Sequence, residues 1–306
     1  MIPFTKAHAC GNDFLIIDEQ DAQGYDKVLL AQRLCQRNTG IGADGIEFYA
    51  STGPNAARIQ LYNADGSIAE ISGNGTRCVA AWMAEELNLQ TGDEVALETD
   101  AGVRICEIDD FRDSDDDGPT VMVTTDMDVP EFSQKSVELA DGTVIDGVYV
   151  NMGNPHFVIL LDAQKRPGEE WKGLLYPDLQ DLAQYTPSGA DFSIGDRAWE
   201  EIGEEICFHS DFPDQTNVEF VRILGGLSTK FNTVGMVIYE RGVGPTSSSG
   251  TGTSATATAM IGEYAGLSPI EVAAPGGVQT VEWGGGPNDK LYLTGPATLV
   301  ARGEAW

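Results

Sequence analysis

Residues 72–83 read SGNGTRCVAAWM and residues 249–260 read SGTGTSATATAM, so the pattern Ser-Gly-x-Gly-Thr occurs twice. Each copy opens a run of small and apolar residues, which is typical of a largely buried helix. A second pair repeats in the same order, because GNDFLIID (11–18) is similar to GNPHFVIL (153–160). Two matched pairs in one order predict that the chain contains the same fold twice.

The start of each repeated helix is a candidate binding site for an anion. The first N–H groups of a helix have no acceptor inside the helix, and the helix dipole adds about half a positive charge there. Glycine also lets a ligand approach the backbone closely. We therefore expect Gly73-Asn74 and Gly250-Thr251 to hold one carboxylate from two sides.

The serine of each pattern has a simpler explanation as an ordinary N-cap, because serine is favoured at that position. Ser72 and Ser249 are each preceded, nine residues earlier, by a polar residue that ends an apolar strand, Asn63 and Glu240. The duplication of both features favours a binding site over capping alone.

Short strands are the main element predicted elsewhere, because apolar residues alternate around turn signals and the chain contains 36 glycines. RIQLYN (58–63) and AEI (69–71) form one predicted hairpin, and Asp141-Gly142 is the turn of another. A further helix is predicted over 26–35, with Asp26 as its cap. A buried helix inside a wrap of strands is the simplest packing for each half.

Polar stretches divide the chain. The Asp-rich run IDDFRDSDDDGP (108–119) is predicted to be a linker or exposed loop, because dense like charges resist burial. The boundary predicts a first domain over 1–115 and a second from 119. The polar stretch 162–197 is interpreted as an insertion, with a lid over a site as the alternative.

The composition excludes several classes of protein. Lys and Arg total 18 against 48 Asp and Glu, a net charge of −30, which argues against nucleic-acid binding because phosphate contacts need clustered cations. No apolar run approaches the roughly 20 residues of a membrane-spanning helix. No basic segment followed by an apolar core opens the chain, so no secretory signal is expected. The acidity fits a high-salt cytoplasm or, equally, an acidic protein of ordinary habitat.

Five cysteines, an odd number without C-x-x-C spacing, favour reduced thiols in a cytoplasm over disulfides or zinc. His156 is one of three histidines and has no second His or Cys at ligand spacing, so we expect no metal there. A structural role and a role in the site remain open for His156, since it belongs to the repeated Gly-Asn motif.

Other polar residues lie where strands end. Glu240-Arg241 follows an apolar strand and precedes a Gly-rich loop, which favours a substrate clamp over a surface ion pair. Four asparagines stand at predicted strand–turn junctions, where each also suits a local turn: Asn12, Asn63, Asn154 and Asn217.

Seven motifs occur in one order along the chain: GNDF, NADGS, GNGTRC, MGNPH, FPxxTNVEFV, ERGVGxT and GTG. Together they resemble the diaminopimelate epimerase family over nearly the whole chain. The resemblance implies an α/β fold of two pseudo-symmetric domains, in which mostly antiparallel strands wrap around a central helix. It places the active site between the domains, and it returns residues 294–306 to the first domain, leaving 119–293 as the second.

Members of this family invert an α-carbon without pyridoxal phosphate or a metal, so the resemblance implies no cofactor. Two cysteines act there as thiolate base and thiol acid, and their positions match Ser72 and Ser249. The positions that match binding groups for the substrate's amine and distal carboxylate are Asn12, Asn63, Asn154, Asn217, Glu240 and Arg241. Those that match the cradle of the reacting carboxylate are Gly73, Asn74, Gly250 and Thr251. His156 and Glu240 match the groups that tune the two thiols, and Pro245 replaces a usual acidic residue.

The two serines change the proton chemistry. A cysteine thiol has a pKa of about 8.5, which a helix N-terminus lowers, whereas a serine hydroxyl is far less acidic. A serine therefore needs a relay, for which His156 and Glu240 are the candidates.

Three hypotheses follow. The chain is an epimerase of diaminopimelate or a similar dicarboxylic amino acid; or it is a dehydratase or isomerase of the same superfamily; or it binds its ligand without turnover. We expect a cytoplasmic protein, a homodimer, with a small dicarboxylic amino acid as ligand and neither nucleic acid nor membrane as partner.

Overall fold

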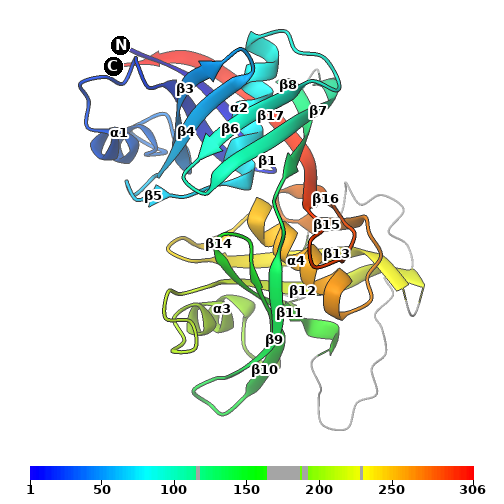
Figure 1. Ribbon diagram of the computed structural model, residues 1–306. Helices are drawn as coiled ribbons and strands as arrows, with labels where there is room; N and C mark the ends of the chain where they lie inside the picture. Colours follow the sequence, from blue (N-terminus) through cyan, green and yellow to red (C-terminus); the bar gives the residue numbers. More distant parts are fainter. Residues whose placement is uncertain (115–117, 164–186, 188–191, 228–229) are drawn as a thin grey trace. The chain divides into compact units, whose positions relative to one another are not determined.

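The computed structural model describes residues 1–114, 118–163, 187, 192–227 and 230–306. The chain divides into two units, which are described one at a time (Figure 1). Unit 1 contains Met1–Asp126 and Thr294–Trp306, and unit 2 contains Met127–Leu293. Most of the predicted insertion over 162–197 lies outside the described residues.

Unit 1 is built mainly from strands, with two helices. Its helices are α1 (Lys27–Leu34) and α2 (Gly73–Glu86). Its strands are β1 (Ile2–Ala9), β2 (Asn12–Asp18), β3 (Gly45–Gly53), β4 (Ala56–Asn63), β5 (Ile68–Ala69), β6 (Glu94–Thr99), β7 (Gly102–Ser114), β8 (Gly118–Asp126) and most of β17 (Leu291–Ala305). β1 pairs antiparallel with both β2 and β17, so the last strand completes the first unit.

Unit 2 is also built mainly from strands. Its helices are α3 (Trp199–Cys207), α4 (Gly250–Glu263) and the short 3₁₀ helix η1 (Leu161–Ala163). Its strands are β9 (Glu131–Glu138), β10 (Val144–Asn151), β11 (Pro155–Leu160), β12 (Asn217–Leu227), β13 (Lys230–Glu240), β14 (Gly244–Thr246), β15 (Ile270–Ala274) and β16 (Gly277–Trp283).

The strand pairing confirms that one fold occurs twice. β2 and β3 pair in parallel with Phe14 opposite Gly45, and β11 and β12 pair in parallel with His156 opposite Asn217. In unit 1, β4 then pairs antiparallel with β3 and parallel with β6. In unit 2, β13 pairs antiparallel with β12 and parallel with β15. The fold class predicted from the family resemblance is therefore correct.

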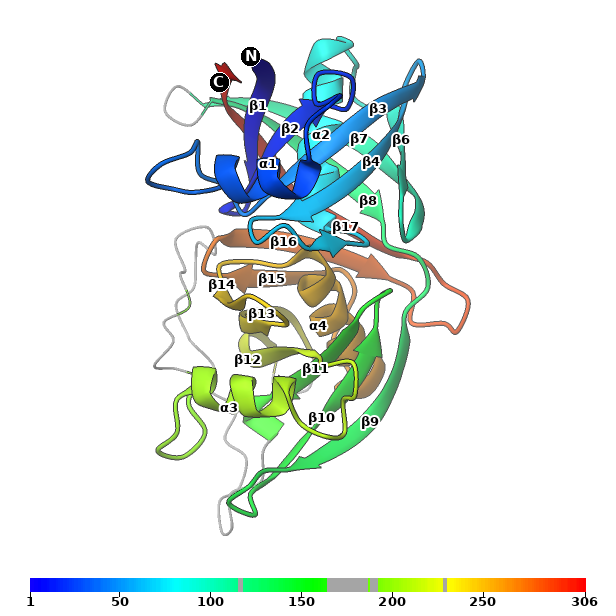
Figure 2. The same cartoon turned by 90° about the vertical axis from the view of Figure 1, so that its left-hand side faces the viewer.

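Each unit encloses a central helix. α2 packs against β1, β2, β6, β7 and β8, and α4 packs against β10, β11, β12, β15 and β16 (Figures 1 and 2). The small residues predicted to line these helices are buried, including Ala80 and Ala81 on α2 and Ala255 and Ala257 on α4. Small side chains let the surrounding strands approach the helix axis closely.

The division between the two units lies beyond the predicted linker. The Asp-rich run does not leave unit 1, because β7 and β8 form an antiparallel hairpin that reaches Ser114 opposite Gly118. The chain passes into unit 2 only after Asp126. Ile108 and Val123 are fully buried while Asp110 is exposed, so one face of the hairpin packs in the core and the acidic residues face water.

Three helices follow the prediction closely, and Asp26 caps α1 as expected, accepting from the N–H groups of Val28 and Leu29. α3 was not predicted. Trp199, Ile202 and Ile206 are buried on one face of α3. Their spacing of three and four residues is typical of an amphipathic helix and is visible in the sequence. No helix in the described ranges is long and apolar enough to cross a membrane.

Candidate active site

Ser72 is the N-cap of α2, so the capping interpretation is correct for this residue. Its backbone is extended, with φ −125° and ψ 120°, and its Oγ accepts from the N–H of Gly75 at 3.0 Å. Capping uses an oxygen lone pair and leaves the hydroxyl hydrogen to bond elsewhere. The cap therefore fixes where Ser72 Oγ lies without removing it from proton transfer.

Ser249 caps α4 in the same way. Its φ is −142° and its ψ 128°, and its Oγ accepts from the N–H of Gly252 at 3.2 Å. Ser249 Oγ also lies 3.4 Å from Thr251 Oγ1. The duplicated pattern thus produces the same local structure in both units, at the start of helices of 14 residues each.

Asn12 and Asn74 meet at the start of α2. Asn74 Nδ2 donates to Asn12 Oδ1 at 3.1 Å, and Asn74 Oδ1 accepts from Arg77 Nη2 at 2.6 Å. Arg77 is fully buried, and burial lowers its pKa. These contacts fix both predicted binding asparagines beside Ser72. We call Asn12, Glu47, Ser72, Gly73 and Asn74 the N-terminal half-site.

A cluster of charges holds Asn12 in place. Asn12 Nδ2 donates to Asp44 Oδ2 at 2.7 Å, and Arg37 bridges Asp44 and Asp13 with hydrogen bonds of 2.7–3.1 Å. Lys6 Nζ lies 2.9 Å from Asp13 Oδ2. Burial alone would raise the pKa of Asp13, but hydrogen bonds and charges from Arg37 and Lys6 hold it below its usual value. Sequence analysis missed this cluster because its members lie far apart in the chain.

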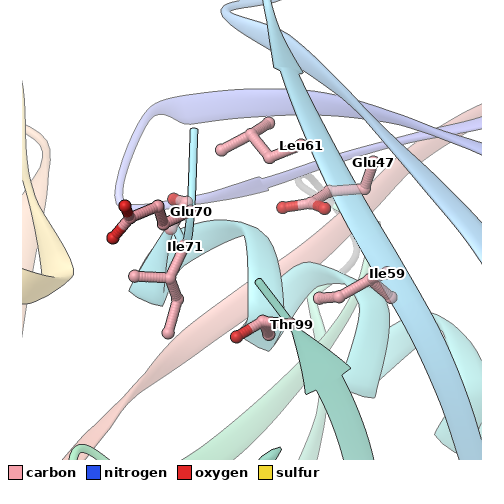
Figure 3. A pocket seen from close by; sticks show the side chains of 7 residues that line it. Glu47, Ile59, Leu61, Glu70, Ile71 and Thr99 are labelled. Carbon is pink, nitrogen blue, oxygen red and sulfur yellow. The ribbon is translucent and has the colours of Figure 1, made fainter. Parts of the chain in front are cut away.

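Glu47 of β3 is an unexpected member of the N-terminal half-site. The side chain is 1% exposed, and burial raises the pKa of its carboxyl to about 8. Its oxygens have no hydrogen-bond partner among the described residues. Glu47 lines a pocket with Glu70 and Thr99 (Figure 3), and Ser72 lines the same pocket. The signal in the sequence was a single Glu inside the apolar strand GIEFY.

His156 is fully buried in unit 2 and uses both of its ring nitrogens. Nδ1 lies 2.6 Å from Glu219 Oε1, and Nε2 lies 3.0 Å from Asn154 Oδ1. Asn154 Nδ2 donates to Thr251 Oγ1 at 3.4 Å, and Thr251 Oγ1 lies 3.4 Å from Ser249 Oγ. We call Asn154, His156, Glu219, Ser249 and Thr251 the C-terminal half-site. Burial raises the pKa of Glu219, while the charge and hydrogen bond of His156 lower it.

Asn217, Glu240 and Arg241 gather where β12 begins and β13 ends. Asn217 Oδ1 accepts from the N–H of Arg241 at 2.8 Å, and Glu240 Oε1 accepts from Thr246 Oγ1 at 2.6 Å. Arg241 is exposed, and its Nη1 donates to the carbonyl of Asp214 at 3.0 Å. The carboxylate of Glu240 and the guanidinium of Arg241 thus have different protein partners.

Asn63 ends β4 and makes the local turn that its position suggested. Its N–H donates to the carbonyl of Ser67, and its Nδ2 donates to Ser67 Oγ at 3.0 Å. Among the described residues, no three His, Cys, Asp or Glu side chains gather as ligands for a metal ion.

Comparison with known proteins identifies the relatives of this duplicated site. The model of the family Diaminopimelate epimerase matches residues 4–131 and 191–300. The chain belongs to the diaminopimelate epimerase family. It is 34% identical to the diaminopimelate epimerase of Corynebacterium glutamicum, covering 99% of this chain and 98% of that protein. It is 31% identical to the diaminopimelate epimerase of Bacteroides thetaiotaomicron, covering 99% and 97%.

Solved structures with other names share the fold at low sequence identity. A Bacillus anthracis phenazine biosynthesis protein has a TM-score of 0.63 at 14% identity, covering 100% of this chain and 99% of that chain. A probable proline racemase from Agrobacterium radiobacter has a TM-score of 0.62 at 15% identity, covering 100% and 93%. At this identity the likeness shows the shared fold alone.

Proposed function

We propose that the chain is an amino acid epimerase that works without pyridoxal phosphate, with diaminopimelate or a similar dicarboxylic amino acid as its substrate. The observation that carries the proposal is the duplicated helix start, which places a capping serine and two adjacent backbone positions identically in each unit. Inversion of an α-carbon needs a proton acceptor on one face and a proton donor on the other. A duplicated half-site provides one such position in each unit.

The helix starts supply the electrostatic part of the reaction. Removal of the α-proton places negative charge on the substrate carboxylate, and the first N–H groups of α2 and α4 are oriented donors for that charge. Gly73 and Gly250 carry no side chain that would block the approach of a carboxylate to the backbone. The Asn12–Asn74 pair and the Asn154–Thr251 pair lie beside these starts as hydrogen-bonding groups for the substrate.

The serines require partners for proton transfer, because a serine hydroxyl is a poor base near neutral pH. In unit 2, hydrogen-bonding contacts connect Ser249, through Thr251 and Asn154, to His156. That these groups, or Glu240, assist Ser249 stays a prediction, as does the action of both half-sites on one α-carbon.

The test is exchange of the α-proton in D₂O with LL- and meso-diaminopimelate, followed by mass spectrometry and chiral chromatography. We expect deuterium at the α-carbon and interconversion of the two forms. The double variant S72C/S249C is the control, because thiols restore the acid–base pair of the family. Exchange by this variant but not by the natural chain would support a binding protein without turnover. No exchange by either protein would contradict the proposed function.

The proposed location is the cytoplasm, and the proposed assembly is a homodimer. The five cysteines support a reducing compartment, because all five are buried thiols that form no disulfide. Sedimentation at micromolar concentration tests the assembly, and a monomer of 32.7 kDa would contradict it.

A further inference from the structure

Arg77 of α2 is a buried charge that the proposed chemistry does not use. The side chain is 0% exposed, and an arginine stays charged inside a protein. Taking a charge out of water is costly unless other groups pair with it. Among the described residues, Nε and Nη1 of Arg77 have no hydrogen-bond partner, and Nη2 donates to Asn74 Oδ1 at 2.6 Å. The charge is therefore kept in the core with a hydrogen bond to a residue of the N-terminal half-site.

The hydrogen bond from Arg77 decides which way the Asn74 amide faces. A guanidinium only donates hydrogen bonds, so the amide oxygen of Asn74 has to face it. The amide nitrogen then faces Asn12, and Nδ2 of Asn74 donates to Asn12 Oδ1 at 3.1 Å. Residues three apart lie on the same side of a helix, so the motif GNGTR itself brings Arg77 within reach of Asn74.

The orientation passes on from Asn74 to Asn12. Because Asn12 Oδ1 accepts from Asn74, Asn12 Nδ2 faces the other way and donates to Asp44 Oδ2 at 2.7 Å. Asn74 is buried, whereas Asn12 is half-buried, so the hydrogen bonds connect the core to a side chain that a ligand can reach. Nδ2 of Asn12 carries two hydrogens, and Asp44 takes one. The other suits a hydrogen-bond acceptor on the ligand, such as a carboxylate oxygen.

Unit 2 has the opposite direction of hydrogen bonding at the equivalent place. In the aligned patterns Thr251 stands where Asn74 stands, and Ser254 stands where Arg77 stands. Ser254 Oγ donates to the carbonyl of Gly250 within its own helix at 2.9 Å. Asn154, the counterpart of Asn12, donates to Thr251 Oγ1, whereas Asn12 accepts from Asn74.

A different buried donor sets the asparagine of unit 2. Asn154 Oδ1 accepts from His156 Nε2 at 3.0 Å, so the imidazole fixes the amide of Asn154. In unit 1 the position of His156 is taken by Phe14, whose ring has no N–H group. Each unit thus orients its asparagine with one buried nitrogen donor, which comes from β11 in unit 2 and from α2 in unit 1.

We propose that Arg77 is a positioning residue of the N-terminal half-site, which acts through Asn74 to hold the Asn12 amide with an N–H group toward the ligand. It replaces the imidazole that serves unit 2. Arg77 itself neither touches the ligand nor transfers a proton. The nature of the ligand rests on the proposed function, whereas the orientation of the Asn12 amide does not.

Binding of LL- and meso-diaminopimelate, measured by titration calorimetry, tests the effect on the ligand. Methionine has a similar length but no N–H group, so R77M is expected to raise Kd by about tenfold. R302M is the matched control, since the exposed Arg302 donates to Glu85 at the other end of α2. R302M is expected to keep the natural Kd.

A double-mutant cycle shows whether Arg77 acts through Asn74. In an N74A chain, adding R77M is expected to change Kd by less than twofold, because the residue that transmits the effect is already gone. A full tenfold loss on top of N74A would overturn the proposal. So would a Kd of R77M within twofold of the natural value.

Urea denaturation separates positioning from a structural role. Replacing a buried charge by an apolar side chain of similar size often leaves stability unchanged or raises it. R77M is therefore expected to keep the urea midpoint while it loses binding, and R77K, which keeps a charged donor, is expected to bind within about threefold of the natural chain. A lower midpoint for R77M with an unchanged Kd would show that Arg77 is structural.

Nuclear magnetic resonance of the ¹⁵N-labelled chain without ligand gives a readout that does not depend on binding. The side-chain amide signals, assigned from N12A and N74A, are expected to exchange slowly with water in the natural chain and in R302M. The Asn12 signals are expected to shift and broaden in R77M. Free exchange of the Asn12 amide in the natural chain, or unchanged Asn12 signals in R77M, would overturn the inference. A natural chain that binds neither form of diaminopimelate would contradict the proposed substrate, and these amide signals would then decide the role of Arg77.

Discussion

Glu47 and Glu219 occupy equivalent positions in the two units, and each carboxyl lies against the second glycine of a Ser-Gly-x-Gly-Thr pattern. A Cβ on Gly75 would lie 2.0 Å from Glu47 Oε1, and a Cβ on Gly252 would lie 3.0 Å from Glu219 Oε1. The pattern therefore does more than expose a helix start to a ligand. It also makes room for a buried acid behind the capping serine.

The first prediction concerns pH and stability. The pKa of Glu47 is about 8 in the folded chain against 4.5 for an ordinary Glu, so between these values the folded state holds a proton that the unfolded state releases. Stability contributed by Glu47 should fall as pH rises through this range, by up to about 1.4 kcal/mol per pH unit. Urea denaturation from pH 5 to pH 8 should show a shallower fall for E47Q. Parallel pH curves for E47Q and the natural chain would contradict it.

The second prediction concerns the space behind Ser72. Gly75→Ala should destabilise the chain by about 1–3 kcal/mol, because the new methyl group overlaps the buried Glu47 carboxyl. Gly53→Ala is the control, since its Cβ would meet Ala56 at an ordinary 3.4 Å. Adding E47A to G75A should recover much of the loss, as measured by denaturant midpoint. Additive effects of the two changes would show that the residues do not interact.

The third prediction concerns the His156–Glu219 pair. His156→Phe copies the arrangement at Phe14 in unit 1, so the ring should fit, but Glu219 loses its partner. Removing one member of a buried pair costs about 3–5 kcal/mol when the other stays charged. The loss should shrink at acid pH, where Glu219 takes up a proton, and thermal unfolding at pH 5 and pH 8 measures it. An equal loss of stability at pH 5 and pH 8 would mean that the charge on Glu219 does not contribute to the cost of removing His156.

The fourth prediction concerns substrate binding through Asn12. Arg37→Met removes the cation that bridges Asp13 and Asp44, and so loosens the carboxylate that holds Asn12. We expect KM to rise by about tenfold, with a smaller change in kcat, because Arg37 positions Asn12 for substrate binding and takes no part in proton transfer. Arg33→Met on α1 is the control, since Arg33 Nη2 donates to the carbonyl of Trp306. An unchanged KM in R37M would place the cluster outside the site.

The fold could be predicted largely from the duplication, because S-G-x-G-T followed by small residues defines a buried helix and occurs twice. The run 108–119 was predicted to be a linker because of its charge density, whereas residues 108–114 belong to β7, in which Ile108 is buried and Asp110 is exposed. The sequence left open whether Ser72 and Ser249 cap their helices, and the structure shows that both do.

The candidate site could be predicted only where it is local in sequence. Ser72, Gly73 and Asn74 are neighbours, so their shared position follows from one motif. Glu47 could not be placed beside them, because that contact depends on which strand faces the start of α2. The same holds for Arg37 and Asp13, because Arg37 lies in the loop after α1 and Asp13 lies on β2.

The pairing of β1 with β17 has a consequence for the order of folding. Ile2 lies opposite Ala305, so unit 1 cannot close its sheet until β17 has been synthesised, whereas unit 2 is one continuous segment. On a ribosome the later-encoded half can mature first, while the earlier half waits with an unpaired strand edge. That exposed edge is a template for association with other nascent chains until β17 has been made.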